Sequence, residues 1–439
     1  MLSKQDNDYL TRIGPGTPMG DLMRQYWIPA VRSDELPESD GAPLRVKLLG
    51  EELIAFRETS GQVGLVQNNC PHRGASLFFG RNEEGGLRCV YHGWKFDSTG
   101  QCIDMPNEPA ESDFKQKVRA VAYPCVERNG VVWAYLGPRQ TPPPLPDFEA
   151  NMLGPGSYSI SMIHRPCNWM QGWEGEMDTA HQAFLHSGAV RVEHTQPGTF
   201  ERYIAATPAP LLSVVDTDFG TSYGGSRPAE DDTTYWRIAH MLFPFYAMIP
   251  TGAMGHEVRF AAYVPMDDEH TMHWEIGAEV PETERPAGAT RSRRGARSKD
   301  LYHPNTTDWY GRFNMVQDAS NDYLIDREAQ RTWKSYTGID GIRQQDMAVT
   351  ESMGPIMDRS NEHLGTTDAL IIRTRRKLIT AARALRERAV TPPGVDTPEV
   401  YRERSGGVIL PRGQDWWSGT AALRARFSPT ATREPTHPA

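Results

Sequence analysis

The sequence contains no run of about eighteen apolar residues, so no segment is expected to cross a membrane as a helix. Its N-terminal residues are polar and lack the apolar core of a signal peptide, which favours a cytoplasmic location. Cysteine is scarce: five residues without disulfide-scaffold spacing are typical of a protein from a reducing compartment. Basic residues are also outnumbered, with 47 Lys and Arg against 56 Asp and Glu, and the net charge of −9 argues against a nucleic-acid partner.

Two of the five cysteines are each followed closely by a histidine. The two motifs are Cys70-Pro71-His72 and Cys89-Val90-Tyr91-His92. Two cysteines for one iron and two histidines for the other are the ligands of a Rieske [2Fe–2S] cluster, which transfers single electrons. Structural zinc is the alternative, but zinc fingers usually keep like ligands paired, whereas each pair here is mixed. Gly74 and Gly93 follow the motifs and permit the tight loops that such a cluster needs.

The segment around these motifs is expected to form an all-β domain. Strand patterns occur from about residue 45 to residue 136, and the proline-rich segment 141–146 is typical of a stiff linker. Residues beyond 391 are rich in proline, arginine and threonine, and we expect them to lie on the surface or to be partly disordered. The expected units are an N-terminal helical segment packed on the catalytic domain (1–26), the Rieske domain (27–140), the linker (141–146), the catalytic domain (147–390) and a C-terminal extension (391–439).

The region after the linker has both helical and strand patterns, so the predicted fold class is α+β. Residues 199–280 contain several strands that suggest one antiparallel sheet, including 234–243 and 257–264. A basic loop at 285–299 is expected to be solvated. The expected helices are 168–187, 341–358 and 366–390.

A second metal site is predicted by the pattern Glu174-x3-Asp178-x2-His181-x4-His186. Two histidines and one carboxylate that leave three coordination positions open form the facial triad of non-haem Fe(II) oxygenases. A helix must loosen or end after His181 if His186 is to reach the same ion. Histidines near an aspartate are often ordinary surface or core residues, but the upstream Rieske motif favours the iron site. The carboxylates considered for the third ligand are Asp178, Asp340, Asp346, Glu351 and Asp358.

With both motifs placed, the chain resembles the oxygenase (α) component of the Rieske non-haem iron aromatic-ring oxygenases, from about residue 10 to residue 385. Within that family it is similar to the subgroup of the phthalate 4,5-dioxygenases, whose oxygenase has only α subunits. This closer resemblance rests on the Glu174-x3-Asp178 spacing and on the segments 345–355 and 358–365. It implies a helix-grip catalytic domain joined to the Rieske domain, and head-to-tail homotrimers that can stack into hexamers.

The resemblance also implies roles for individual residues. His181, His186 and Asp346 match the ligands of a mononuclear Fe(II), and Asp178 does not. Asp178 instead matches the bridging aspartate of the family, which accepts one hydrogen bond from His181 and one from the neighbouring subunit's His92. Electrons are then expected to pass from the Rieske cluster of one subunit to the iron of the next.

The implied reaction is the cis-dihydroxylation of phthalate with O2 and two electrons from NADH. A separate flavin and iron–sulfur reductase is expected to deliver the electrons, because this chain shows no glycine-rich nucleotide fingerprint. Phthalate is a dianion, so arginines are expected in the pocket. Arg202 and Arg237, both in predicted strands, are the candidates, and Arg259 is a weaker third. For each arginine, the alternative is a salt bridge to an acidic side chain on the same sheet.

Two alternatives to phthalate dioxygenation stay open. One is a related Rieske oxygenase acting on another aryl carboxylate: isophthalate, chlorobenzoate, phenoxybenzoate or, by O-demethylation, a methoxybenzoate. The other is an electron carrier with a degenerate iron site, although the presence of Asp178, His181 and His186 argues against it. Product analysis with several aryl carboxylates tests the first alternative, and substrate-dependent O2 uptake tests the second.

Overall fold

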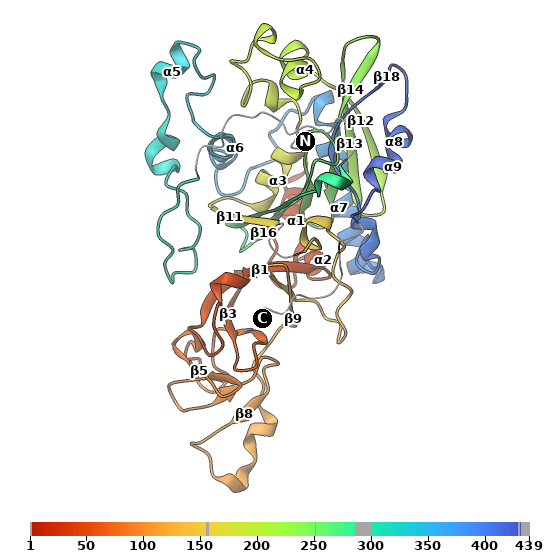
Figure 1. The fold of residues 1–439 in the computed structure, drawn as a ribbon. Coiled ribbons are helices and arrows are strands. Elements are labelled where there is room, and N and C mark those ends of the chain that lie inside the picture. Colours follow the sequence, from red (N-terminus) through yellow and green to blue (C-terminus); the bar gives the residue numbers. More distant parts are fainter. Residues whose placement is uncertain (1, 155–157, 251, 286–299, 429–430, 432–439) are drawn as a thin grey trace.

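The two predicted metal sites lie in different parts of an elongated molecule. The computed structural model describes residues 2–154, 158–250, 252–285, 300–428 and 431. Figure 1 shows a small β-rich unit at one end and a larger unit of sheet and helices at the other. The small unit carries the two Cys–His motifs, and the larger unit carries the segment with the histidines and carboxylates.

Short antiparallel sheets build the small unit, in the orders β1-β10-β9, β2-β3-β4 and β5-β6-β7-β8. Leu49 and Gly50 form the left-handed turn between β2 and β3. Their N–H groups donate to the carbonyls of Pro265 and Met266, so this turn docks the small unit on the larger one. The strands are β1 (Trp27–Arg32), β2 (Leu44–Leu48), β3 (Glu51–Arg57), β4 (Val63–Gln67), β5 (Arg81–Glu83), β6 (Gly86–Arg88), β7 (Lys95–Phe96), β8 (Cys102–Asp104), β9 (Cys125–Arg128) and β10 (Val131–Tyr135).

The N-terminal segment contains two short helices, α1 (Lys4–Thr11) and α2 (Pro18–Met23). Each begins after a hydroxyl side chain, Ser3 or Thr17, that accepts a main-chain N–H of the first turn. Both helices pack on α7 (Ala369–Arg388) of the larger unit.

The larger unit is built on one antiparallel sheet, as predicted, and in the described residues the sheet has eight strands, two of which lie outside the predicted range 199–280. Its order is β11-β17-β16-β15-β14-β13-β12, and β18 also pairs with β14. The predicted strands at 234–243 and 257–264 correspond to β14 and β16. The strands are β11 (Tyr158–Arg165), β12 (Leu211–Thr217), β13 (Gly220–Pro228), β14 (Thr233–Leu242), β15 (Tyr246–Met248), β16 (Glu257–Pro265), β17 (Thr271–Glu279) and β18 (Gly406–Pro411).

The prediction that the chain beyond residue 391 is a surface tail is wrong for the residues described there. β18 pairs antiparallel with β14 over six residue pairs, from Thr233↔Pro411 to Ile238↔Gly406. Trp416, in α8 (Trp416–Gly419), is 1 % exposed and packs near Trp236 of β14. The overall proline and arginine content of the segment concealed a short β-forming run, Gly406-Gly407-Val408-Ile409-Leu410, which extends the catalytic sheet.

The predicted helix at 168–187 is shorter in the structure, because α3 (Trp169–Met177) ends at Asp178. The Asp178 carboxylate accepts the N–H groups of Ala180 and His181, which replaces the next helical turn. The helix predicted at 341–358 is also shorter, because α6 (Ile342–Glu351) ends at Glu351, and the helix predicted at 366–390 corresponds to α7.

Residues 200–204, predicted to lie in a strand, belong to helix α4 (Phe200–Ala206), so the strand assignment of Arg202 is wrong. The aromatic and aliphatic residues around Arg202 suggested a strand, but Tyr203 and Ile204 are buried next to each other, as on one side of a helix. Of the basic loop predicted at 285–299, only Arg285 lies within the described residues; it contacts Glu279 and the carbonyl of Val280. No helix of the described ranges is long and apolar enough to cross a membrane.

Candidate metal centres and active-site cavity

The two Cys–His motifs form loops with the same hydrogen-bond pattern. In the first loop, Cys70 N–H donates to the carbonyl of Ala75 and Gly74 N–H donates to that of Cys70. In the second, Cys89 N–H donates to the carbonyl of Trp94 and Gly93 N–H donates to that of Cys89. Both glycines have a positive φ, of 76° and 81°, which a residue with a Cβ rarely adopts. The two loops thus share the same main-chain pattern from the cysteine to the residue after the glycine, and each loop carries one histidine between its cysteine and its glycine.

These loops bring the two histidine rings together. The ring centroids of His72 and His92 are 4.4 Å apart, and Cys70 and Cys89 are each 3 % exposed. The buried Nδ1 of His72 has no hydrogen-bond partner among the described residues. Two buried thiols and two neighbouring imidazoles, one with a buried nitrogen that lacks a partner, match the donor set of a Rieske [2Fe–2S] cluster. The residues that would hold the cluster are Cys70, His72, Cys89 and His92.

Trp94, which follows the second Cys–His motif, also supports this site. Its ring stacks on His72 with centroids 4.3 Å apart and an interplanar angle of 13°. Its Nε1 donates to Asn107 Oδ1 at 2.7 Å, which fixes the indole. Trp94 therefore restricts the rotation of the His72 ring.

The second candidate centre joins two histidines to one carboxylate. His181 Nε2 lies 3.2 Å from His186 Nε2, and His186 Nε2 lies 3.2 Å from Asp346 Oδ1. His181 Nε2 is 3.9 Å from the same carboxylate oxygen. Among the described residues, these three form a group whose donor atoms all lie within 4.8 Å of one another. The set matches the two histidines and one carboxylate that hold a non-haem iron and leave positions open.

The other carboxylates considered for this site have different roles in the structure. Glu351 pairs with Arg165, and Asp358 is exposed and accepts hydrogen bonds from Ser360. Asp340 lines the same cavity but is not part of the group of converging donors. Asp346 is thus the carboxylate that the fold brings to the two histidines.

Each histidine also contacts a group on its other ring nitrogen. Asp178 Oδ2 lies 3.4 Å from His181 Nδ1, and Gln345 Oε1 lies 2.8 Å from His186 Nδ1. Such contacts orient an imidazole so that its Nε2 faces the metal. The contact between Asp178 and His181 was predicted from the sequence, whereas no role was predicted for Gln345. Because Gln345 directly precedes the predicted ligand Asp346, its sequence position could have suggested a role at the iron site.

The carboxylates are held in their ionised form. Burial would raise the pKa of Asp178, but hydrogen bonds from His181 and from main-chain N–H groups outweigh it and lower the pKa. Burial would likewise raise the pKa of Asp346, and the contact with His186 lowers it below the ordinary value. For His181, burial lowers the pKa, and the hydrogen bond to Asp178 and the charge of Asp346 raise it overall.

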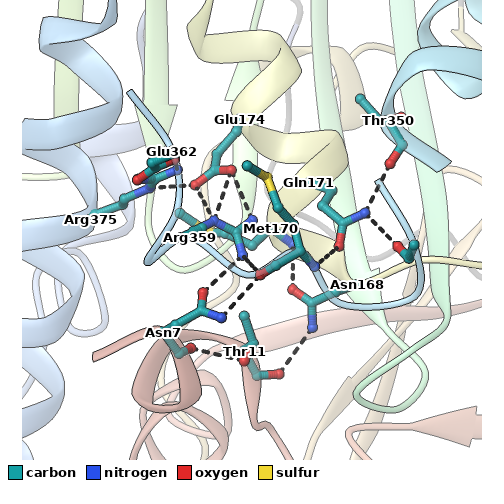
Figure 2. Close-up of polar contacts among 12 residues, drawn as sticks. Asn7, Thr11, Asn168, Met170, Gln171, Glu174, Thr350, Arg359, Glu362 and Arg375 are labelled. Atoms are coloured by element: carbon teal, nitrogen blue, oxygen red, sulfur yellow. Dashed lines mark hydrogen bonds and ion pairs between the residues drawn. The ribbon is translucent and has the colours of Figure 1, made fainter. Parts of the chain in front are cut away.

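A polar network fixes the helices that carry the second centre. Figure 2 shows Glu174 of α3 between the guanidinium groups of Arg359 and Arg375, and Gln171 of α3 directed toward Thr350 of α6. Gln171 Nε2 donates to the carbonyl of Thr350 at 2.9 Å. Because α6 carries Asp346 and α3 leads to Asp178 and His181, these contacts set the position of the carboxylate relative to the histidines.

The second centre opens into a cavity of about 1290 Å³, which contains aromatic, apolar and charged side chains. Arg237 of β14 lines it and is 2 % exposed. Arg259 also lines it but pairs with Glu275 of the neighbouring strand. Arg202 is not on the cavity wall; its Nε donates to Glu230 at 2.9 Å. Of the arginines predicted for substrate binding, the structure thus brings Arg237 to the metal site and does not bring Arg202.

Comparison with known proteins identifies two family models. The Rieske [2Fe-2S] domain model matches residues 26–124, and the model described as LigXa C-terminal domain like matches residues 134–434. The fold of dicamba monooxygenase is similar, with a TM-score of 0.55 at 19 % identity over 83 % of this chain and 99 % of that one. The oxygenase of carbazole 1,9a-dioxygenase has a TM-score of 0.52 at 20 % identity over 85 % and 94 % of the two chains.

Two relatives match nearly the whole chain at higher identity. The oxygenase subunit of 3-chlorobenzoate-3,4-dioxygenase from Comamonas testosteroni is 47 % identical over 95 % of this chain and 97 % of its own length. The oxygenase subunit of phthalate 4,5-dioxygenase from Pseudomonas putida is 37 % identical over 88 % and 87 %. With a Rieske domain, a catalytic domain of matching family and these relatives, the chain belongs to the Rieske non-haem iron oxygenases, as their oxygenase component.

Proposed function

We propose that this chain is the oxygenase component of a ring dioxygenase that acts on an aryl carboxylate. The observation that carries the proposal is the position of Arg237 on the wall of the cavity that contains His181, His186 and Asp346. The Arg237 Nε has no hydrogen-bond partner among the described residues, although the side chain is buried. A buried guanidinium with an unpaired donor favours a ligand that brings a carboxylate.

We favour a benzoate with one carboxylate, of the chlorobenzoate class, over phthalate. Phthalate was expected to bind to two arginines, but Arg202 pairs with Glu230 and lies off the cavity. The 3-chlorobenzoate enzyme is also 47 % identical to this chain, against 37 % for the phthalate enzyme. Phthalate remains the second candidate, because its two carboxylates fit the same cavity chemistry and its enzyme matches over 88 % of this chain.

When bound, the iron would activate O2 and the cluster would supply electrons, and the residues of the chain would position the reactants. Arg237 would hold the carboxylate end of the substrate in the cavity. His181 and His186 would present Nε2, with Asp178 and Gln345 fixing their rings from the opposite nitrogen. A fixed substrate end places one region of the ring beside the metal, which is how positioning selects the carbons that react.

Electron supply is proposed to need a second copy of the chain. The sheet β5–β8 lies at the far end of the molecule from α6, so one chain does not bring its two centres together (Figure 1). Side chains near the Rieske loops are exposed, including Tyr91 at 55 % and Phe79 at 63 %. Phe184, which lies between the two iron-site histidines in the sequence, is 55 % exposed and next to Tyr336. Exposed apolar side chains near the Rieske loops and near the iron-site histidines fit a head-to-tail homotrimer, stacked or single, in which Asp178 meets the neighbouring subunit's His92.

The test is substrate-dependent O2 uptake by the purified oxygenase with NADH and a flavin and iron–sulfur reductase. Uptake is expected with 3-chlorobenzoate, less with phthalate and not with 3-chlorobenzamide, which has the same shape and no charge. Two atoms from labelled O2 in a cis-dihydrodiol would distinguish dioxygenation from hydroxylation or O-demethylation. Equal uptake with the amide would contradict an aryl carboxylate as substrate, and no substrate-dependent uptake with any aromatic compound would favour an electron carrier.

A further inference from the structure

A second buried arginine lies beside Arg237 on the catalytic sheet. In the antiparallel pair of β13 and β14, Arg227 is opposite Tyr235 and Gly225 is opposite Arg237. Residues directly opposite each other share a face, and so do residues two apart in one strand, so both arginines point to the same side of the sheet. They are diagonal neighbours, a separation that long side chains span.

Both guanidinium groups are anchored by one main-chain carbonyl and leave other donors unpaired. Arg227 Nε donates to the carbonyl of Thr207 at 2.9 Å, and Arg237 Nη1 donates to that of Pro250 at 3.2 Å. Arg227 Nη1 and Nη2 and Arg237 Nε are buried and have no hydrogen-bond partner within the described ranges. Arg227 is 1 % exposed and Arg237 2 %. The positive charge on this face is therefore poorly compensated by the protein.

An uncompensated buried charge destabilises the ligand-free fold and attracts an anion. Burial and, to a smaller extent, the nearby charge of Arg237 together lower the pKa of Arg227 to about 10. The group still carries its proton at neutral pH. Arg359 and Arg375, which are also buried, are both paired with Glu174. Arg227 and Arg237 differ from them, because among the described residues no carboxylate accepts a hydrogen bond from Arg227 Nη1, Arg227 Nη2 or Arg237 Nε.

We propose that Arg227 is a specificity-determining residue, which selects an anionic group at the Arg237 end of the metal-site cavity. Arg237 lines the cavity and contacts the anion, while Arg227 lies behind it and acts through its charge. This inference rests on the proposed function for the location of the substrate, and it extends that proposal by naming the residue that sets the charge preference. It predicts preference for a carboxylate or another oxyanion over a neutral group of equal shape.

The experiment measures ligand binding to the holoenzyme by calorimetry, and the midpoint of thermal unfolding without ligand. The variants are Arg227→Met, which removes the charge and keeps an unbranched chain, and Arg227→Lys, which keeps the charge. Arg202→Met is the matched control, because Arg202 pairs with Glu230 away from the cavity. The probes are 3-chlorobenzoate, 3-chlorobenzenesulfonate and 3-chlorobenzamide.

In Arg227→Met, the Kd of 3-chlorobenzoate should rise by about 10-fold or more, which is about 1.4 kcal/mol. The Kd of the amide should change by less than about 2-fold, and the unfolding midpoint should stay or rise because an unpaired charge is gone. Arg227→Lys should keep most of the preference for the acid, and Arg202→Met should match the wild type. If Arg227→Met does not fold, Arg227→Gln gives the same comparison of acid with amide.

Two results would overturn the inference. One is an unchanged Kd of the acid in the neutral variants; the other is equal weakening of acid and amide together with a lower unfolding midpoint, which indicates a structural role. Failure of the proposed function gives a different pattern. In that case no carboxylate would stimulate O2 uptake by the wild type, which contradicts the proposed function. The sulfonate would still bind more weakly to Arg227→Met than to the wild type, which supports the role of Arg227 in selecting an anion. If the wild-type protein turns over carboxylates and Arg227→Met binds them with an unchanged Kd, the inference about Arg227 is wrong and the proposed function stands.

Discussion

Gln345 Oε1 lies 2.8 Å from His186 Nδ1, while the next residue, Asp346, places its Oδ1 3.2 Å from Nε2 of the same ring. Helix α6 therefore contacts both nitrogens of one imidazole. The Gln345 amide is itself fixed, because its Nε2 donates to the carbonyl of Ile339 at 2.9 Å and to Thr337 at 3.2 Å. With the amide oxygen facing the ring, His186 must carry its proton on Nδ1, which leaves the Nε2 lone pair for a metal.

Replacing Gln345 should weaken iron binding without disturbing the Rieske site. Loss of such a supporting contact typically weakens metal binding about 10- to 100-fold, and we expect Gln345→Leu to fall in that range. Iron per chain after dialysis against a chelator, with the Rieske absorbance as internal reference, measures the effect. Gln344→Leu is the matched control, because Gln344 is on the same helix and contacts Asp300. Equal iron loss in both variants would point to a general disturbance of α6.

Asp346→Asn should lose iron more completely than any variant of the surrounding residues. The amide keeps the shape of the carboxylate but removes the negative charge that a metal ion requires from this group. Iron content and product formation should both fall sharply, while the visible spectrum of the Rieske cluster stays. Full iron occupancy with normal turnover would mean that another carboxylate binds the metal, and Asp340, on the same cavity wall, would be examined first.

Cys70→Ala should remove the Rieske cluster and leave the iron site intact, the reverse of the result expected for Asp346→Asn. Cys70 is 3 % exposed and begins the first of the two matching loops, so its loss removes one thiolate from the cluster. The visible Rieske spectrum should disappear, and the histidine–carboxylate centre should still take up Fe(II). His181→Ala is the complementary variant, which should keep the spectrum and form no product. A Rieske spectrum that survives in Cys70→Ala would refute the assigned cluster ligands.

The sequence predicted the parts of the site that depend on local spacing. The Cys–His motifs correspond to two loops with a shared hydrogen-bond pattern, and the Asp178–His186 pattern requires the helix end that the structure shows. Residues that meet through tertiary packing were harder to predict. Asp346 was chosen among several carboxylates by family resemblance, because no local pattern places α6 beside the histidines.

Two further differences have the same cause. The strand predicted around Arg202 was suggested by its aromatic and aliphatic neighbours, but the segment forms helix α4 and packs against β13 and the turns that precede it. Arg227 was not considered, because its lack of a partner follows from strand register and burial, which composition does not reveal. Arg237 was predicted in a strand and lies in β14, since its neighbours form a long β-rich run.

Asp178→Asn should uncouple the two centres while leaving both loaded. Asp178 contacts His181 Nδ1 and is not part of the converging metal donors, so iron and cluster should both remain. The variant loses the negative charge that stabilises the His181 imidazole and, in the proposed trimer, the neighbouring subunit's His92. Electron transfer from the cluster to the iron in a single turnover should slow by orders of magnitude. The rate is measured as the disappearance of the spectrum of the reduced Rieske cluster. Wild-type transfer rates would remove Asp178 from the electron path.

Glu174→Gln should destabilise the fold rather than the chemistry. Glu174 is 8 % exposed and lies between Arg359 and Arg375, so its neutralisation leaves two buried guanidinium groups without their shared carboxylate (Figure 2). Breaking a buried pair by removing one charge typically costs about 3–5 kcal/mol, and the free energy of unfolding at pH 7 should fall by that order. Glu328→Gln is the control, because its pair with Arg331 is exposed and should contribute under about 1 kcal/mol.

The pH dependence of unfolding separates this ion pair from a simple packing defect. Burial would raise the pKa of Glu174, but the charges of Arg359 and Arg375 outweigh it and lower the pKa below its ordinary value. A carboxylate whose pKa is lowered in the folded state stabilises the fold fully above the unfolded-state pKa of about 4.3, and this contribution disappears as the pH falls through the folded-state value. The stability difference between wild type and Glu174→Gln should therefore be constant near neutral pH and shrink in acid. A difference that does not change with pH would mean that the glutamine disturbs packing on α3 rather than removing a charge.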